Sequence, residues 1–252
     1  MLTHPTLDKL RTMQLEGMAI ALQEQLELNN AKDLSFEERL ALLIDREFAH
    51  RDNRRFTRRL RNAKLKQHAT LEDIDYKHPR SLDKALLRSL STGDYFREHH
   101  NLVISGPTGV GKTYLACALA HQACRQGYSA FYAQTSRLLQ ELTLMKADGR
   151  YFKTLARLAK TDVLILDDWG LEPLANEPRR LLLELLDDRY DKTSTLIASQ
   201  LPVELWYDYL SDPTLADAIL DRIVHNSYRL ELKGDSLRKT KKSLTATPTT
   251  TS

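Results

Sequence analysis

Short apolar runs alternate with helical patterns from about residue 81 onward. The segments between the runs place apolar residues at helical spacing and predict helices over 112–126, 136–147, 152–160, 178–190, 203–210 and 214–226. The runs themselves are rich in β-branched and aromatic residues and predict strands over 102–105, 129–133, 163–166, 195–198 and 228–232. Because strands alternate with helices, we expect an α/β fold with a central, mainly parallel five-stranded sheet flanked by helices.

Residues 1–66 show helical periodicity without a strand pattern. Apolar residues recur imperfectly over 7–26, and Ser35 with Glu38 predicts a capping box that opens a second helix. An apolar stripe on this helix gives way to arginines, and His78-Pro79 later disfavours helix. The expected organisation is a small all-helical N-terminal domain over 1–66, a linker over 67–80, the α/β domain over 81–243 and a disordered tail over 244–252.

The composition, 42% hydrophobic and 28% charged, argues against wholesale disorder. No apolar run approaches the roughly 18 residues that cross a bilayer, and the first residues lack a signal-peptide pattern. The two cysteines, Cys117 and Cys124, lie on one predicted helix and are interpreted as small core residues. We therefore expect a cytoplasmic protein with no membrane partner.

Positive charge is concentrated in two segments. Residues 46–66 hold nine Lys/Arg against two acidic residues, and residues 222–242 hold seven against two. Clustered cations suit the phosphates of duplex DNA, although a single basic run can also be a solvated helix face. The candidate DNA-binding residues share a wide basic face of the second predicted helix: Arg51, Arg54, Arg55, Arg58 and Arg59.

A phosphate-binding loop follows the first predicted strand. Residues 106–113 read GPTGVGKT, which matches G-x-x-x-x-G-K-[ST] and opens a helix. Glycines let backbone N–H groups point at phosphate oxygens, and the helix N-terminus adds positive potential. Lys112 is expected to neutralise the β- and γ-phosphates of ATP, and Thr113 to coordinate Mg²⁺. The expected nucleotide-binding residues are Gly106, Pro107, Thr108, Gly109, Val110, Gly111, Lys112, Thr113 and Tyr114.

Two carboxylates end the strand predicted over 163–166. Asp167 is expected to hold Mg²⁺ through water, and Asp168 to orient or deprotonate the attacking water. Asp168 stands where many ATPases have Glu. Another predicted strand, 129–133, lies between the two motifs along the chain, as in P-loop motors whose phosphate-loop and metal strands are not adjacent. The pattern disfavours a small nucleotide kinase and predicts a Mg²⁺-dependent ATPase.

Several stretches resemble the IstB family, the AAA+ helper ATPases of insertion sequences, which are relatives of DnaC-type helicase loaders. They are SGPTGVGKTYLACALA, LILDDWG, TLIASQLPVELW and ADAILDRIVHNSYRLELKGDSLRK, and the likeness extends to the N-terminal helical region. The resemblance implies that Gln200 senses the γ-phosphate or its water, where helicase loaders commonly have Asn. It also implies that Arg222 enters the ATP site of a neighbouring subunit and that Arg238 contacts phosphate in its own chain.

The resemblance further implies a homo-oligomer with ATP sites at its subunit interfaces. Such a protein would assemble on duplex DNA without sequence specificity and assist a cognate transposase in target capture. A replicative helicase loader, a non-hydrolysing ATP-gated DNA scaffold and a small-molecule kinase are the alternatives. The residues around the phosphate loop favour hydrolysis over the scaffold, and the basic segments would go unexplained in a kinase.

Overall fold

The computed structural model describes residues 5–27, 33–76 and 80–237 of the 252-residue chain. The chain divides into two compact units, Met1–Arg58 and Arg59–Ser252. The division lies inside one 28-residue helix, α3 (Phe36–Ala63). Arg238 and the predicted tail over 244–252 lie outside the described residues.

The first unit is helical, as the periodicity of residues 1–66 predicts. It contains α1 (Pro5–Thr12), α2 (Glu16–Glu27) and the first part of α3. The capping box is present, since Ser35 N donates to Glu38 Oε2 at 2.8 Å and Glu38 N donates to Ser35 Oγ at 3.2 Å. The predicted apolar stripe along α3 is largely exposed within this unit, with Phe36 and Phe48 each 74% accessible.

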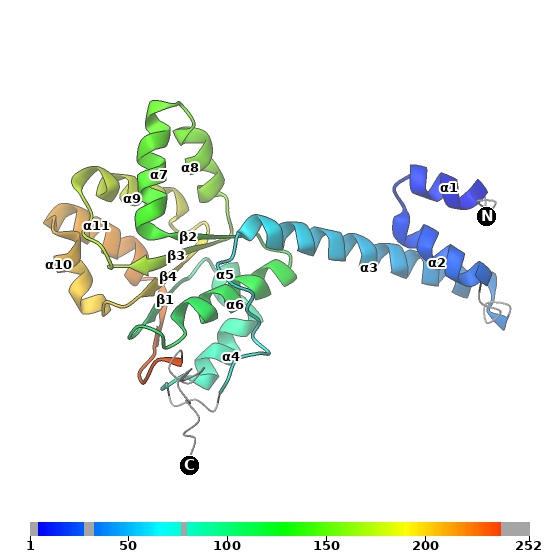
Figure 1. The fold of residues 1–252 in the computed structure, drawn as a ribbon, viewed down its shortest axis with the longest axis horizontal. Helices are drawn as coiled ribbons and strands as arrows, with labels where there is room; N and C mark the ends of the chain where they lie inside the picture. Colours follow the sequence, from blue (N-terminus) through cyan, green and yellow to red (C-terminus); the bar gives the residue numbers. More distant parts are fainter. Residues whose placement is uncertain (1–4, 28–32, 77–79, 238–252) are drawn as a thin grey trace, which may run out of the picture. The chain divides into compact units, whose positions relative to one another are not determined.

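The second unit is built on a parallel sheet, which confirms the predicted fold class. Its strands within the described residues lie in the order β2-β3-β4-β1-β5, and every neighbouring pair is parallel (Figure 1). β4 therefore separates the phosphate-loop strand β1 from the metal strand β3, as the motif spacing predicted. The strands are β1 (Asn101–Ser105), β2 (Ala130–Gln134), β3 (Val163–Trp169), β4 (Ser194–Ser199) and β5 (Ser227–Glu231).

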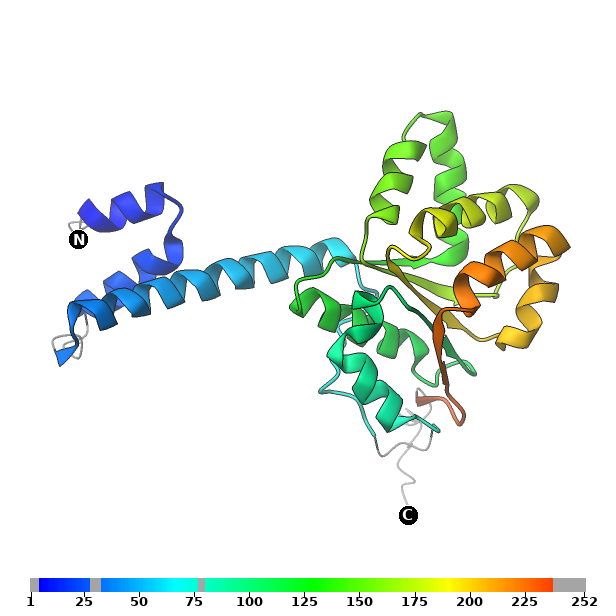
Figure 2. The same ribbon diagram turned by 180° about the vertical axis from the view of Figure 1, so that it is seen from behind.

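Helices cover both faces of this sheet (Figures 1 and 2). One face packs on the small apolar residues of α6 (Lys112–Arg125). The other face places Val103, Leu164, Leu166 and Ile197 in a core with a second group of helices. These helices are α7 (Thr135–Ala147), α8 (Tyr151–Ala159), α9 (Asn176–Arg189), α10 (Trp206–Leu210) and α11 (Pro213–Val224). The helix predicted over 203–210 begins with a 3₁₀ turn, η2 (Val203–Leu205), before α10.

Two short helices before β1 were not predicted. They are α4 (Lys84–Thr92), which Asp83 caps by accepting from Ala85 N and Leu86 N at 2.9 Å, and α5 (Asp94–Arg97). Their amphipathic pattern is too short to stand out in sequence, and packing of buried Leu87 and Leu90 stabilises α4.

Within the expected linker over 67–80, several of the described residues pack in the second unit. Ala69, Ile74 and Arg80 are 1%, 5% and 2% exposed. Ala69 forms a small apolar cluster with Cys117 and Ala118 of α6. The polar composition of this segment hides the three positions that pack inward.

Cys117 and Cys124 are buried, unpaired core residues, as expected. Burial raises the pKa of Cys124 to about 11, so its thiol stays protonated at neutral pH. Among the described residues, none of the helices combines the length and apolar character needed to span a membrane.

Candidate nucleotide-binding site

The phosphate loop connects β1 to α6 at the carboxyl edge of the sheet. Gly106, Gly109 and Gly111 have φ angles of 145°, 83° and 104°, the range that favours glycine. A Cβ atom at Gly106 would lie 2.2 Å from Leu232 O, and one at Gly109 would lie 2.0 Å from Ser236 Oγ. The loop therefore needs glycine for both its backbone conformation and its packing.

Lys112 curls back over the loop that precedes it. Its side chain is buried, and Nζ donates to Gly106 O at 2.7 Å and to Pro107 O at 2.9 Å. Across the loop, Thr108 Oγ1 donates to Gln200 Oε1 at 2.6 Å. The loop thus presents a positive group on one side and, on the other, an amide at the end of β4.

Asp167 and Thr113 form the candidate metal-binding pair. Thr113 Oγ1 donates to the two carboxylate oxygens of Asp167 at 2.9 and 3.1 Å, and Tyr132 Oη donates to Oδ2 at 2.7 Å. Burial and this hydrogen bond to Asp167 raise the pKa of Tyr132, so the phenol remains a donor. A hydroxyl beside a carboxylate supplies the oxygen ligands that Mg²⁺ prefers, and the pair therefore fits that ion.

Asp168 follows in an unusual backbone conformation. Its φ angle is 57°, and the register between β3 and β4 shifts between Leu166 and Trp169. Gln134 Nε2 donates to Asp168 Oδ2 at 2.8 Å. In a regular strand, consecutive side chains point to opposite faces, and the irregular backbone here breaks that alternation. Asp168 consequently borders the same cavity as the phosphate loop.

This cavity has a volume of about 730 Å³. Tyr114, Asp168, Gln200 and five residues of the phosphate loop form one part of its wall, and Leu237 adds a residue after β5. The five loop residues are Thr108, Gly109, Gly111, Lys112 and Thr113. The remaining wall comes from the segment before α4: Lys66, Gln67, Asp73, Asp75 and Arg80. The structure therefore brings Asp168 and most of the phosphate loop to a single cavity. Gly106, Pro107, Val110 and Asp167 are not part of its described wall.

Four residues near the phosphate loop escaped the sequence analysis: Lys66, Arg80, Tyr132 and Gln134. Gln134 pairs in register with Asp167, so a prediction of the strand order could have pointed to the end of β2. Arg80 is buried and donates to Val110 O at 3.4 Å and to Asp75 O at 3.1 Å. Burial lowers the pKa of Arg80. No motif in the sequence marks Lys66 or Arg80.

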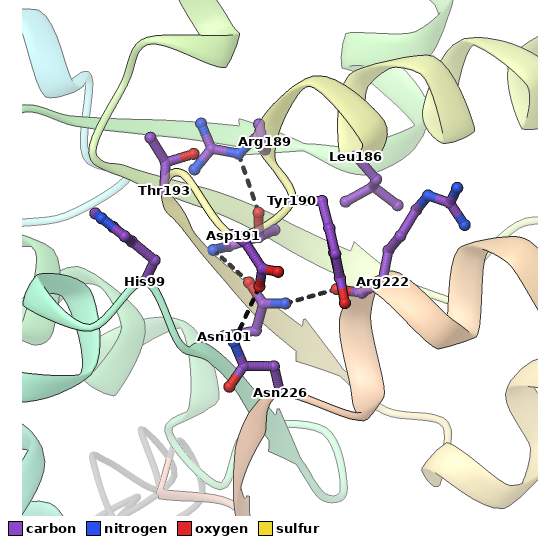
Figure 3. A pocket seen from close by; sticks show the side chains of 10 residues that line it. His99, Asn101, Leu186, Arg189, Tyr190, Asp191, Thr193, Arg222 and Asn226 are labelled. Carbon is purple, nitrogen blue, oxygen red and sulfur yellow. Dashed lines mark hydrogen bonds between the residues drawn. The ribbon is translucent and has the colours of Figure 1, made fainter.

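Arg222 lies on α11, outside the described wall of the nucleotide cavity. Its Nε donates to the carboxylate of Asp187 on α9, and Nη1 donates to Ala218 O at 2.7 Å. The Arg222 side chain is 27% exposed. Figure 3 shows it at a separate, small pocket beside Asn101 and Arg189. Arg222 is thus near the surface and away from its own phosphate loop.

The candidate DNA-binding arginines all lie on α3. Arg51 Nε pairs with Glu47 at 2.6 Å, and Arg59 Nε donates to Cys124 O at 2.9 Å. The other three, Arg54, Arg55 and Arg58, are exposed, and their side chains make no hydrogen bond or ion pair within the described part of the chain. These three are the members of the set whose charges are directed to solvent.

Comparison with protein families identifies relatives along nearly the whole chain. The family model for the IstB-like ATP binding protein matches residues 8–245. An insertion sequence ATP-binding protein of Sinorhizobium fredii (strain NBRC 101917 / NGR234) is 51% identical over 239 residues, covering 95% of this chain and 98% of the relative. The ATP-binding protein of insertion sequence IS1162 from Pseudomonas fluorescens is 54% identical over 203 residues, covering 80% and 88%.

Solved structures share the fold of the second unit. The DnaI structure superposes with a TM-score of 0.55 at 22% identity, covering 70% of this chain and 93% of DnaI. The DnaC helicase loader gives a TM-score of 0.52 at 24% identity, covering 69% and 99%. These likenesses show that the fold is shared with DnaI and the DnaC helicase loader, and the family match confirms the resemblance to the IstB family seen in the sequence. The chain therefore belongs to the IstB-like ATP-binding protein family.

Proposed function

We propose that this protein is a Mg²⁺-dependent AAA+ ATPase that assembles on duplex DNA and assists a partner transposase in target capture. The cavity that joins Lys112, Asp168 and Gln200 is the observation that carries the ATPase proposal. The insertion-sequence relatives support the transposition context. The same assembly would act in the cytoplasm, where it meets DNA and transposase.

The geometry supports a division of labour among the site residues. Lys112 exchanges its loop carbonyls for the β- and γ-phosphates, while the loop N–H groups bind phosphate oxygens. Thr113 and Asp167 would hold Mg²⁺, which would supply positive charge to neutralise the phosphates. Asp168 orients or deprotonates the attacking water, and Gln200 senses the γ-phosphate from the opposite side of the loop.

Arg222 is proposed to complete the site of a neighbouring copy. It is distant in the fold from its own phosphate loop and partly exposed, as a residue that acts across a subunit interface needs to be. In the single chain, an ion pair with Asp187 holds the Arg222 side chain against α9. Assembly would exchange that pair for the phosphates of the adjoining nucleotide, which makes hydrolysis depend on oligomer formation.

The decisive experiment measures ATP hydrolysis at several protein concentrations, with and without duplex DNA. We expect the rate per chain to rise with protein concentration and with DNA, because the complete site needs two chains on one duplex. Lys112→Ala is the control that removes the phosphate-binding ammonium. Nucleotide binding without turnover under every condition would contradict the motor proposal and favour an ATP-gated scaffold. Pull-down with the cognate transposase, compared with a replicative helicase, tests the proposed partner.

Replacing Arg54, Arg55 and Arg58 together with glutamate should weaken binding to duplex DNA. These side chains are exposed and are not neutralised by acidic partners in the described structure. Each lost phosphate contact should reduce the slope of log affinity against log salt by about 0.9. Fluorescence anisotropy with a labelled duplex at several salt concentrations measures both the affinity and the slope.

A matched control reverses three exposed arginines elsewhere, so that the net charge changes equally. Suitable positions, which lie outside both basic segments, are Arg88, Arg157 and Arg180. If both triple variants bind DNA equally, the effect reflects overall charge, and the basic face of α3 is not part of the DNA-binding surface.

A further inference from the structure

Lys66 brings one ammonium group to both catalytic carboxylates. Its Nζ lies 3.4 Å from Asp167 Oδ2 and 3.7 Å from Asp168 Oδ2. The same Nζ lies 6.0 Å from the centroid of the Tyr132 ring, and the Tyr132 hydroxyl also binds Asp167. Two neighbouring carboxylates repel each other, so a cation that contacts both of them stabilises their ionised forms.

The segment that carries Lys66 is packed against α6. Leu65, Leu71 and Tyr114 contact the cluster formed by Ala69, Cys117 and Ala118. Burial raises the pKa of the Cys117 thiol, and hydrogen bonds from the backbone of Gln67 and Lys66 oppose that rise.

Further along the segment, Glu72 accepts from Arg125 Nη1 at 2.6 Å. These contacts fix the backbone of the segment that carries Lys66. The position of its ammonium group near the two carboxylates therefore depends on this packing as well as on the length of the side chain.

The position of Lys66 has a consequence for cation binding at the site. Asp167 is the carboxylate that, with Thr113, fits Mg²⁺, and Lys66 already directs a positive charge to one of its oxygens. Lys66 has to release Asp167, or share it at an electrostatic cost, before that carboxylate can hold a divalent cation. Asp168 remains within reach as the alternative partner of Lys66.

We propose that Lys66 is a positioning residue, an internal counter-cation that holds Asp167 and Asp168 before nucleotide arrives and thereby sets the Mg²⁺ concentration needed for nucleotide binding. The inference rests on the proposed ATP and Mg²⁺ site. It assigns a role to a residue before the α/β domain that no sequence motif marks. Its charge competes with Mg²⁺ for Asp167, so its removal makes the cation easier to bind.

The test measures binding of a fluorescent, non-hydrolysable ATP analogue as a function of Mg²⁺ concentration at low salt. Lys66→Met keeps the length of the side chain and removes its charge. The half-saturating Mg²⁺ concentration is expected to fall about two- to five-fold, the range for a partly exposed ion pair. Lys66→Arg, which keeps the charge, is expected to retain the wild-type value. Lys66→Gln provides a second neutral variant should the methionine variant misfold.

Lys64→Met is the matched control. Lys64 lies two residues earlier on the same segment, and its Nζ lies 5.8 Å from the Phe131 ring centroid, in a pocket separate from the nucleotide cavity. Lys64→Met should leave the half-saturating Mg²⁺ concentration unchanged. An equal shift in both methionine variants, or no shift in folded Lys66 variants, overturns the inference. If wild-type protein binds no nucleotide at any Mg²⁺ concentration, the proposed function fails as well, so the two failures are distinguishable.

Discussion

Arg222→Ala should lower ATP turnover by about 10³-fold or more, the effect of removing an arginine that stabilises transition-state charge. ATP binding by the single chain should persist, because Arg222 lies outside its own nucleotide cavity. Comparing the steady-state rate with the affinity for a non-hydrolysable analogue separates the two effects. A parallel loss of binding would indicate that Arg222 supports the fold of its own chain.

Two controls separate an interface role from a structural one. Asp187→Ala breaks the same ion pair while keeping Arg222, and should retain turnover. Mixing Lys112→Ala with Arg222→Ala chains should restore part of the activity, because the first supplies an arginine and the second an intact phosphate loop. If the mixture stays inactive although the two variants co-assemble, Arg222 does not act across the interface.

Asp168→Asn should reduce turnover by about 10²- to 10⁴-fold, the contribution typical of a general base. Asparagine tolerates the positive φ of 57° at this position, and its side-chain oxygen can still accept from Gln134. The fold and ATP binding should therefore persist while proton abstraction is lost. Single-turnover kinetics with radiolabelled ATP measure the chemical step directly.

Asp191→Asn is the matched control for this substitution. Asp191 also has a positive φ, 53°, and lies at the separate pocket beside Arg222 rather than in the nucleotide cavity. It should leave turnover unchanged. Retention of the wild-type rate by Asp168→Asn would instead show that this carboxylate does not deprotonate the attacking water.

The sheet was accessible from sequence because its central strands are buried on both faces. Residues 163–166 and 196–198 are continuous apolar runs, and this is the pattern of a parallel strand covered by helices. The unpredicted α4 lacks such a signal, since two buried leucines over nine residues do not distinguish a helix from a loop. The apolar stripe on α3 was predicted correctly as a helix face, but it is exposed in the structure. Periodicity predicts an amphipathic helix and does not predict which part of the protein packs on its apolar face.

The residues of the candidate site also fall into two groups, those that a sequence motif predicts and those that only the folded chain brings near. Lys112 and Thr113 could be assigned because the phosphate loop is contiguous, and its chemistry depends on local backbone geometry. Lys66 and Gln134 reach Asp167 and Asp168 from 101 and 34 residues away along the chain, and these contacts depend on the tertiary fold. Sequence spacing carries no information about such contacts.

The family, the parallel α/β fold and the location of the phosphate loop could be predicted from the sequence alone, because they depend on periodicity and on contiguous motifs. Which distant groups surround Asp167 and Asp168, and that Arg222 lies away from its own phosphate loop, follow only from the folded chain. Hydrogen bonds and ion pairs depend on distance in space and not on separation along the chain, so sequence spacing does not predict them.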